Sequence, residues 1–313
     1  MFHRRSTTPR TTPRYLARDA LRDYHPQGRL PLWSLRCICK HSTPKGVRKV
    51  YKARPLLGSG PLAVKVIAAP GGARADYEAM MDAHAFAPDL NERPLFIDDL
   101  RGVVATPYHS RGTIQRYVAT SDHDGMIAGA GRWLRRFHDL GPVHRLRSFS
   151  TRRPADWLAK PPFARAPLLR YPDLHDALTR READLTGAPC QIVTGHNDFK
   201  PANIVDSARG YLSIDRSRQG TTLVETEIAR FLFVLRRNYT VNRLLADRAD
   251  ARAARDREIF LDAYGYDMGR IDQLDLAYDR AVAHAWLCAD SEEIRPEKRA
   301  FLGREVARIA QAA

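Results

Sequence analysis

The stretch that decides the fold reads His196-Asn197-Asp198-Phe199-Lys200-Pro201-Ala202-Asn203-Ile204-Val205, and Tyr211-Leu212-Ser213-Ile214-Asp215 follows it. The segments 191–194 and 204–205 have the composition of strands and enclose a loop. The polar run 206–210 predicts the turn of a hairpin whose second strand is 211–214. A loop held between strands in this way presents an acid, a base and an amide from a rigid frame.

The hairpin register indicates a metal site. Counting outward from its turn places Asn203 opposite Ile214, so Asn203 and Asp215 are expected side by side at the base of the hairpin. An amide oxygen and a carboxylate form a hard-oxygen site suited to Mg²⁺. Asp198 is expected at the mouth of the same site. Phosphoryl transfer requires these components, because a metal neutralises the phosphate oxygens and a carboxylate accepts the proton of the attacking hydroxyl.

Lys65 is a candidate to bind the phosphates of ATP. It stands in the run Leu62-Ala63-Val64-Lys65-Val66-Ile67, which is otherwise apolar. A lysine in the middle of such a strand is costly to bury unless it is paired. Glu78, in the next predicted helix, is the candidate partner of Lys65. Asp76 and Asp82 are alternatives in the same helix.

The two parts of the chain differ in the secondary structure that they predict. Residues 31–111 show strand-like alternation interrupted by turns, whereas residues 112–313 show apolar residues mainly at helical spacing. This order predicts an α+β fold with two lobes, a small antiparallel β N-lobe and a larger, mainly helical C-lobe. The strands expected in the small lobe are 36–41, 47–54, 62–68, 95–98 and 102–106, and its expected helix is 73–85.

The charge and the N-terminal segment say less about function. Residues 1–30 predict a disordered basic arm and a short helix at 15–24. The net charge of +15 has two interpretations. It suits a surface that attracts an anion, but arginines that are scattered along the chain and solvated explain it equally well. Basic and aromatic residues are not interleaved, so no nucleic-acid partner is expected. No secretory signal and no transmembrane run is visible, so we expect a cytoplasmic protein for which peripheral membrane contact stays open.

The pattern His-x-Asp-x-x-x-x-Asn, a strand and then Ile-Asp resembles the protein-kinase-like superfamily. Within it, the chain resembles bacterial small-molecule phosphotransferases, namely the aminoglycoside and choline kinase-like enzymes and the lipopolysaccharide (Kdo/heptose) kinases. The strand around Lys65 resembles the phosphate-lysine strand of the family. Gly131–His138 resembles the helix before the catalytic loop, and Glu227–Leu232 resembles the helix after the metal aspartate. The similarity covers roughly residues 36–240.

The resemblance implies a phosphotransferase that uses ATP and Mg²⁺ and transfers to an alcohol group. On this basis Asp198 corresponds to the catalytic base. Asn203 and Asp215 correspond to the Mg²⁺ ligands and so to part of the nucleotide site. Lys65 corresponds to the clamp on the ATP phosphates, oriented by Glu78.

The chain also departs from the family pattern. It has no Gly-x-Gly-x-x-Gly, so the turn 42–46 would have to cover the phosphates with a single glycine. This degraded loop suggests one alternative, a pseudokinase that acts as an interaction module. Lys200 stands where protein serine/threonine kinases place a catalytic lysine that meets the transferred phosphate. It suggests a second alternative, an atypical protein kinase.

The acceptor expected from the resemblance is a hydroxyl on a small molecule, a sugar or a glycolipid. Arg216 and Arg218 follow the metal aspartate directly, as basic residues do in the lipopolysaccharide kinases. Together with the basic composition, they favour an anionic acceptor.

Overall fold

The computed structural model describes residues 12–24, 33–43, 46–55, 60–117, 120, 122–141, 145–148, 171–215, 220–242, 244–291 and 294–312. The chain divides into two compact units. The first comprises Met1–Arg111 with Leu212–Ile214, and the second comprises Gly112–Tyr211 with Asp215–Ala313. No helix in the described ranges is long and apolar enough to cross a membrane.

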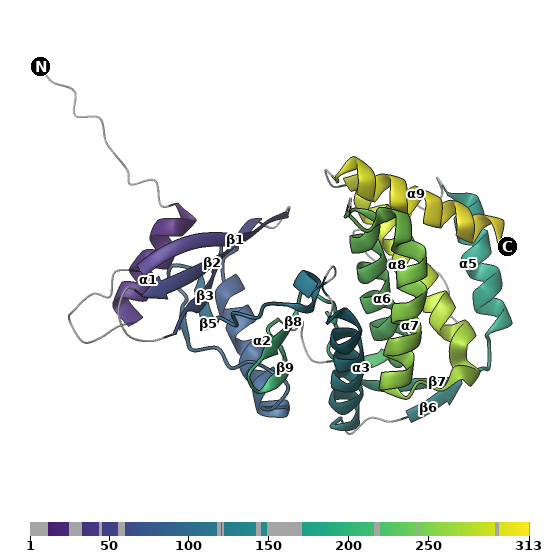
Figure 1. Ribbon diagram of the computed structural model, residues 1–313, viewed down its shortest axis with the longest axis horizontal. Helices are drawn as coiled ribbons and strands as arrows, with labels where there is room; N and C mark the ends of the chain where they lie inside the picture. Colours follow the sequence, from purple (N-terminus) through teal and green to yellow (C-terminus); the bar gives the residue numbers. More distant parts are fainter. Residues whose placement is uncertain are drawn as a thin grey trace, which may run out of the picture. The chain divides into compact units, whose positions relative to one another are not determined.

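The first unit contains an antiparallel five-stranded sheet with the strand order β1-β2-β3-β5-β4 (Figure 1). The five predicted strands are all present. The first two are longer than expected, because their ladder runs from Trp33 opposite Pro55 to Thr43 opposite Gly46. The strands are β1 Trp33–Thr43, β2 Gly46–Pro55, β3 Leu62–Ile67, β4 Phe96–Asp98 and β5 Val103–Pro107.

Helices α1 (Pro13–Tyr24) and α2 (Gly72–Phe86) cover opposite faces of this sheet. Val64 and Val66 share a buried cluster with residues of α1, whereas Val104 clusters with Met80 of α2. Successive residues of a strand point to opposite faces, so Lys65, between the two valines, points towards α2. The helix expected at 15–24 begins earlier than predicted, at Pro13. Its buried residues belong to the core of the first unit.

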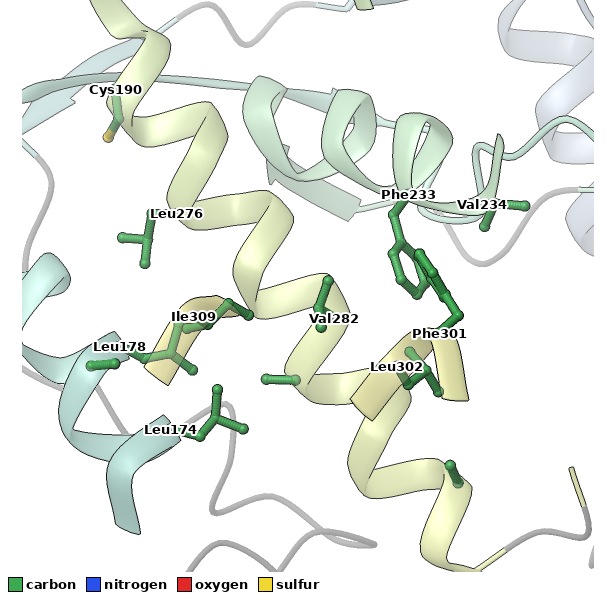
Figure 2. Packing of buried hydrophobic residues seen from close by; sticks show 13 residues of the cluster. Leu174, Leu178, Cys190, Phe233, Val234, Leu276, Val282, Phe301, Leu302 and Ile309 are labelled. Atoms are coloured by element: carbon green, nitrogen blue, oxygen red, sulfur yellow. The ribbon is translucent and has the colours of Figure 1, made fainter. Parts of the chain in front are cut away.

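The second unit is mainly helical, as predicted (Figure 1). In it α5, α6 and α9 pack against the long α8, and α3 packs against α7. Figure 2 shows one of its buried clusters, in which α5, α6, α8 and α9 meet. The ring of Phe233 on α6 lies 6.1 Å from that of Phe301 on α9. The helices are α3 His123–Asp139, α5 Pro172–Asp184, α6 Val224–Thr240, α7 Ala249–Tyr264, α8 Ile271–Ser291 and α9 Pro296–Gln311, with short 3-10 helices at Ile114–Tyr117, Ala246–Arg248 and Met268–Arg270.

Short strands enclose the loop formed by residues 196–203. The sequence predicts β7 (Pro189–Gly195) and the hairpin of β8 (Ile204–Ser207) and β9 (Gly210–Ser213). It does not predict two four-residue strands that pair with β7, β6 (Arg145–Ser148) and β10 (Gly220–Leu223).

Candidate active site

The loop between β7 and β8 is anchored by Phe199, whose side chain is fully buried. Its ring stacks on Phe231 of α6 at 4.9 Å between centroids and on Trp133 of α3 at 5.5 Å. Asp198 and Lys200, on either side of Phe199, are only partly buried. The aromatic contact therefore fixes the loop while its two charged neighbours stay accessible to a ligand.

Nitrogen donors surround the Asp198 carboxylate. Lys200 Nζ lies 2.6 Å from Asp198 Oδ2, and Asn203 Nδ2 lies 2.8 Å from the same oxygen. The Asn203 amide also donates to the Asp198 backbone carbonyl at 2.9 Å. On the other side, Arg230 Nη1 lies 3.7 Å from Asp198 Oδ1. The structure thus brings Asp198, Lys200 and Asn203 together, with the orientation of the carboxylate fixed.

The residue before Asp198 has an unusual backbone. Asn197 has φ 64°, the only positive φ among the described residues other than glycine. Asparagine tolerates this left-handed conformation better than most residues do. The side-chain amide of Asn197 donates to the Gly195 backbone carbonyl at 3.2 Å, and Arg230 donates to the Asn197 backbone carbonyl at 2.7 Å. These contacts hold the turn that presents Asp198.

A buried carboxylate, that of Glu227, binds the backbone of the loop. Glu227 of α6 is 3% exposed and accepts hydrogen bonds from the backbone N–H groups of His196, at 2.9 Å, and Asn197, at 2.5 Å. His138 Nε2 lies 3.1 Å from the same carboxylate, and His138 Nδ1 lies 2.8 Å from the Tyr264 hydroxyl. The sequence pattern of Glu227–Leu232 indicates the helix that carries Glu227, but not these contacts.

The charge state of this buried group follows from its contacts. Burial alone raises the pKa of the Glu227 carboxyl, but the hydrogen bond to His138 and the neighbouring His196 outweigh it, so that the pKa lies below its ordinary value. Burial raises the pKa of Tyr264, which therefore keeps its proton and donates to His138. The chain of contacts from Tyr264 through His138 thus ends on an ionised Glu227 carboxylate.

The residues present suit a hard divalent cation. Both hydrogen bonds of the Asn203 side chain use its amide nitrogen, so its side-chain carbonyl oxygen is the group that a cation would contact. Asp215 follows β9 by two residues and is partly buried. The described ranges contain no group of three or more His, Cys, Asp or Glu side chains that could hold a metal. An amide and a carboxylate fit Mg²⁺, which usually takes its other ligands from phosphates and water.

In the first unit, Lys65 is paired as expected but with a different partner. Lys65 Nζ lies 2.7 Å from Asp76 Oδ2, and both side chains are 14% exposed. Glu78 is 62% exposed and lies 4.0 Å from Arg74. The prediction that Glu78 orients Lys65 is therefore wrong. Residues two apart are rotated by about 200° around the helix axis, so they lie on nearly opposite faces of the helix. Asp76 and Glu78 therefore cannot both face the sheet.

The turn expected to cover the phosphates is largely strand. Ser42 pairs with Val47 and Thr43 with Gly46 in the β1–β2 ladder. The two strands thus extend to Thr43 and from Gly46, and residues 44–45 lie outside the described residues. Arg216 and Arg218, expected near the acceptor, lie outside the described residues.

Arg230 is the main site residue that sequence reasoning missed. It contacts both Asn197 and Asp198 from α6. A signal existed, because Arg230 comes three residues after Glu227, and side chains at that spacing share a helix face.

A cavity of about 530 Å³ lies elsewhere in the second unit, among α5 to α9. No residue of the loop between β7 and β8 lines it. Arginines and aspartates of its wall pair with each other, as Arg308 does with Asp279 at 2.6 Å. This cavity is therefore separate from the candidate active site.

Solved structures of similar architecture include a choline kinase, an aminoglycoside phosphotransferase and an amicoumacin kinase. A choline kinase from Cryptosporidium parvum Iowa II matches with a TM-score of 0.58 and 10% identity, covering 94% of this chain and 93% of that chain. The aminoglycoside phosphotransferase APH(4)-Ia matches with a TM-score of 0.57 and 14% identity, covering 90% and 94%. Amicoumacin kinase hAmiN, in complex with AMP-PNP, Ca²⁺ and Ami, matches with a TM-score of 0.56 and 12% identity, covering 89% and 88%.

No protein-family model matches the chain, and no curated protein matches its sequence. At identities of 10%, 14% and 12% the likeness to these structures establishes the fold, and it extends over nearly the whole chain. The expected α+β fold is thereby confirmed. The chain has the protein-kinase-like fold of the aminoglycoside phosphotransferases and the choline and ethanolamine kinases.

Proposed function

We propose that this protein is an ATP- and Mg²⁺-dependent phosphotransferase that moves the γ-phosphate of ATP to a hydroxyl of a small molecule. The observation that carries the proposal is the arrangement around Asp198. A partly buried carboxylate is oriented by Lys200 and Asn203 on a loop that aromatic packing and Glu227 hold in place. A carboxylate placed in this way can accept the proton of an attacking hydroxyl.

Each residue then has a defined part in the reaction. Lys65, held by Asp76, binds the ATP phosphates. Asp198 takes the hydroxyl proton while the acceptor oxygen bonds to the γ-phosphorus and the bond to the β-phosphate oxygen breaks, which releases ADP. Lys200 contacts the phosphoryl group in transfer. Asn203 and Asp215 would hold Mg²⁺, which when bound neutralises phosphate charge.

The proposed acceptor is an anionic sugar or glycolipid. Asp198 is flanked by two cations, Lys200 and Arg230, whose side chains are 34% and 44% exposed. A cationic acceptor would be repelled by both, whereas an acceptor with a phosphate or carboxylate beside its hydroxyl would be attracted. The net charge of +15 acts in the same direction at longer range.

The test is ADP release by the purified protein with MgATP and a panel of acceptors. The panel contains a Kdo-bearing lipid, choline-like alcohols, aminoglycosides and a generic protein, each also assayed with Asp198→Ala. We expect turnover with the anionic sugar lipid and a loss of roughly 10³-fold in the variant, because removal of a catalytic base has an effect of this size.

The possible results separate the alternatives. Turnover with the protein alone would favour a protein kinase. No turnover and no thermal stabilisation by MgATP would favour a pseudokinase. Wild-type turnover by Asp198→Ala would show that Asp198 is not the base.

A further inference from the structure

The carboxylate that holds Lys65 also holds a second cation. Asp76 Oδ2 lies 2.7 Å from Lys65 Nζ, and Asp76 Oδ1 lies 3.3 Å from Arg48 Nη2. The two oxygens of one side chain thus each contact a different basic group. The ammonium of Lys65 and the guanidinium of Arg48 therefore lie close together beside one carboxylate.

The sheet register explains why the two cations are neighbours. In the β2–β3 ladder, Val50 lies opposite Lys65 and Arg48 lies opposite Ile67. Arg48 and Lys65 are therefore diagonal neighbours on one face of the sheet, the face that α2 covers. Arg48 is the nearer of the two to the β1–β2 turn, because β2 begins at Gly46.

Both cations can be reached by a ligand. The side chain of Arg48 is 39% exposed and that of Lys65 is 14% exposed. Two like charges on one carboxylate repel each other, and a bound anion would relieve that repulsion. A guanidinium suits phosphate oxygens in particular, because its planar set of N–H donors matches them in pairs.

The form of the β1–β2 connection adds a second argument. In a glycine-rich loop, backbone N–H groups bind the phosphates directly. Here the ladder continues to the pair Thr43 and Gly46, so this segment is strand up to the turn itself. A side chain on the adjacent strand can provide the contacts that such a loop would make.

We propose that Arg48 is a second phosphate-binding residue, which together with Lys65 binds the polyphosphate of a nucleoside di- or triphosphate. The inference rests on the proposed function for the presence of a nucleotide. It extends that function by assigning the role of the missing glycine loop to a side chain of β2.

The experiment is equilibrium binding of MgATP, MgADP and adenosine to the full chain, by titration calorimetry. We expect Arg48→Ala to weaken MgATP and MgADP about tenfold, the effect of one lost charge-assisted hydrogen bond, and to leave adenosine unchanged. Arg48→Gln should give the same loss, because it keeps a donor for Asp76 and removes the charge. Its binding can be measured even if the alanine variant is unstable.

The matched control is Arg54→Ala. Arg54 is an exposed arginine on the same strand and the same face, opposite Ser34, so its removal changes the net charge equally. It should bind MgATP as the wild type does. Wild-type affinity in both Arg48 variants would overturn the inference and leave the proposed function standing. An equal loss for adenosine, or for Arg54→Ala, would also overturn it. A wild-type protein that binds no MgATP would overturn the proposed function too.

Discussion

Two carboxylates hold the two parts of the proposed active site: Glu227 holds the loop that carries Asp198, and Asp76 holds Lys65. The two carboxylates differ in burial and in the kind of group that they bind. Glu227 is 3% exposed and binds backbone N–H groups of the catalytic loop, together with a buried histidine. Asp76 is 14% exposed and binds only side chains, the cations of Lys65 and Arg48, among the contacts resolved for it. The loop is thus fixed by the fold, whereas the lysine is held by a contact that a ligand can rearrange.

The difference has a physical basis. A buried carboxylate with all its donors in place is a strong constraint, because loss of any partner leaves a polar group unpaired away from water. An ion pair near the surface is screened and exchanges readily with solvent or a bound anion. The proposed reaction would use this division, since the proposed base must be positioned before the acceptor arrives, whereas Lys65 must release part of its contact to bind phosphate.

The largest expected effect is that of Glu227→Ala. It leaves the N–H groups of His196 and Asn197 without their acceptor, and we expect the free energy of unfolding to fall by about 3 kcal/mol. Urea denaturation followed by circular dichroism measures this. Glu78→Ala is the control, because Glu78 is exposed and its removal should change stability by less than about 0.5 kcal/mol. Equal stability of the two variants would show that the buried contacts do not hold the loop.

A smaller effect is expected from Asp76→Asn, and it should appear in nucleotide binding rather than in folding. The amide keeps the shape of the side chain but no longer neutralises Lys65, so we expect a KM for ATP about tenfold higher. Glu78→Gln makes the same chemical change two residues away and should leave KM unaltered. If the two variants exchanged these results, the pairing of Lys65 with Asp76 would be wrong.

The sequence predicts the fold and the position of the loop between β7 and β8 well, because both depend on local patterns. The alternation in residues 31–111 and the helical spacing afterwards are strong periodic signals, and the segment His196–Asn203 is a contiguous motif. The hairpin after it follows from its turn residues. Two four-residue strands, β6 and β10, are missed because segments so short are set by their partner β7 rather than by their own sequence.

Contacts between distant segments are harder to predict. The choice between Asp76 and Glu78 depends on the rotation of α2 over the sheet, and that rotation is set by the packing of Met80 and Ala73 against Val104. Arg230 is missed for the same reason, since its partner Asn197 lies 33 positions earlier in the chain. Helix spacing reduces the candidates to one face, but only packing selects the residue.

The smallest expected effect is a pH dependence that separates two acids on the same helix. The pKa of Glu227 lies below its ordinary value of 4.5, because the contacts with His138 and His196 outweigh burial. Its contribution to stability is therefore complete above about pH 4.5 and is lost as the pH falls through the lower, folded-state pKa. Burial instead raises the pKa of Glu225 despite the nearby Arg270, so its contribution is lost as the pH rises through the folded-state pKa.

The two Gln variants should show these opposite slopes. From pH 7 downwards, the stability difference between wild type and Glu227→Gln should stay constant to about pH 5 and then shrink. The difference between wild type and Glu225→Gln should instead shift in favour of the wild type as the pH falls. Urea denaturation at a series of pH values measures both. Parallel slopes for the two variants would mean that the charge of Glu227 does not support the loop and that neutral hydrogen bonding alone is enough.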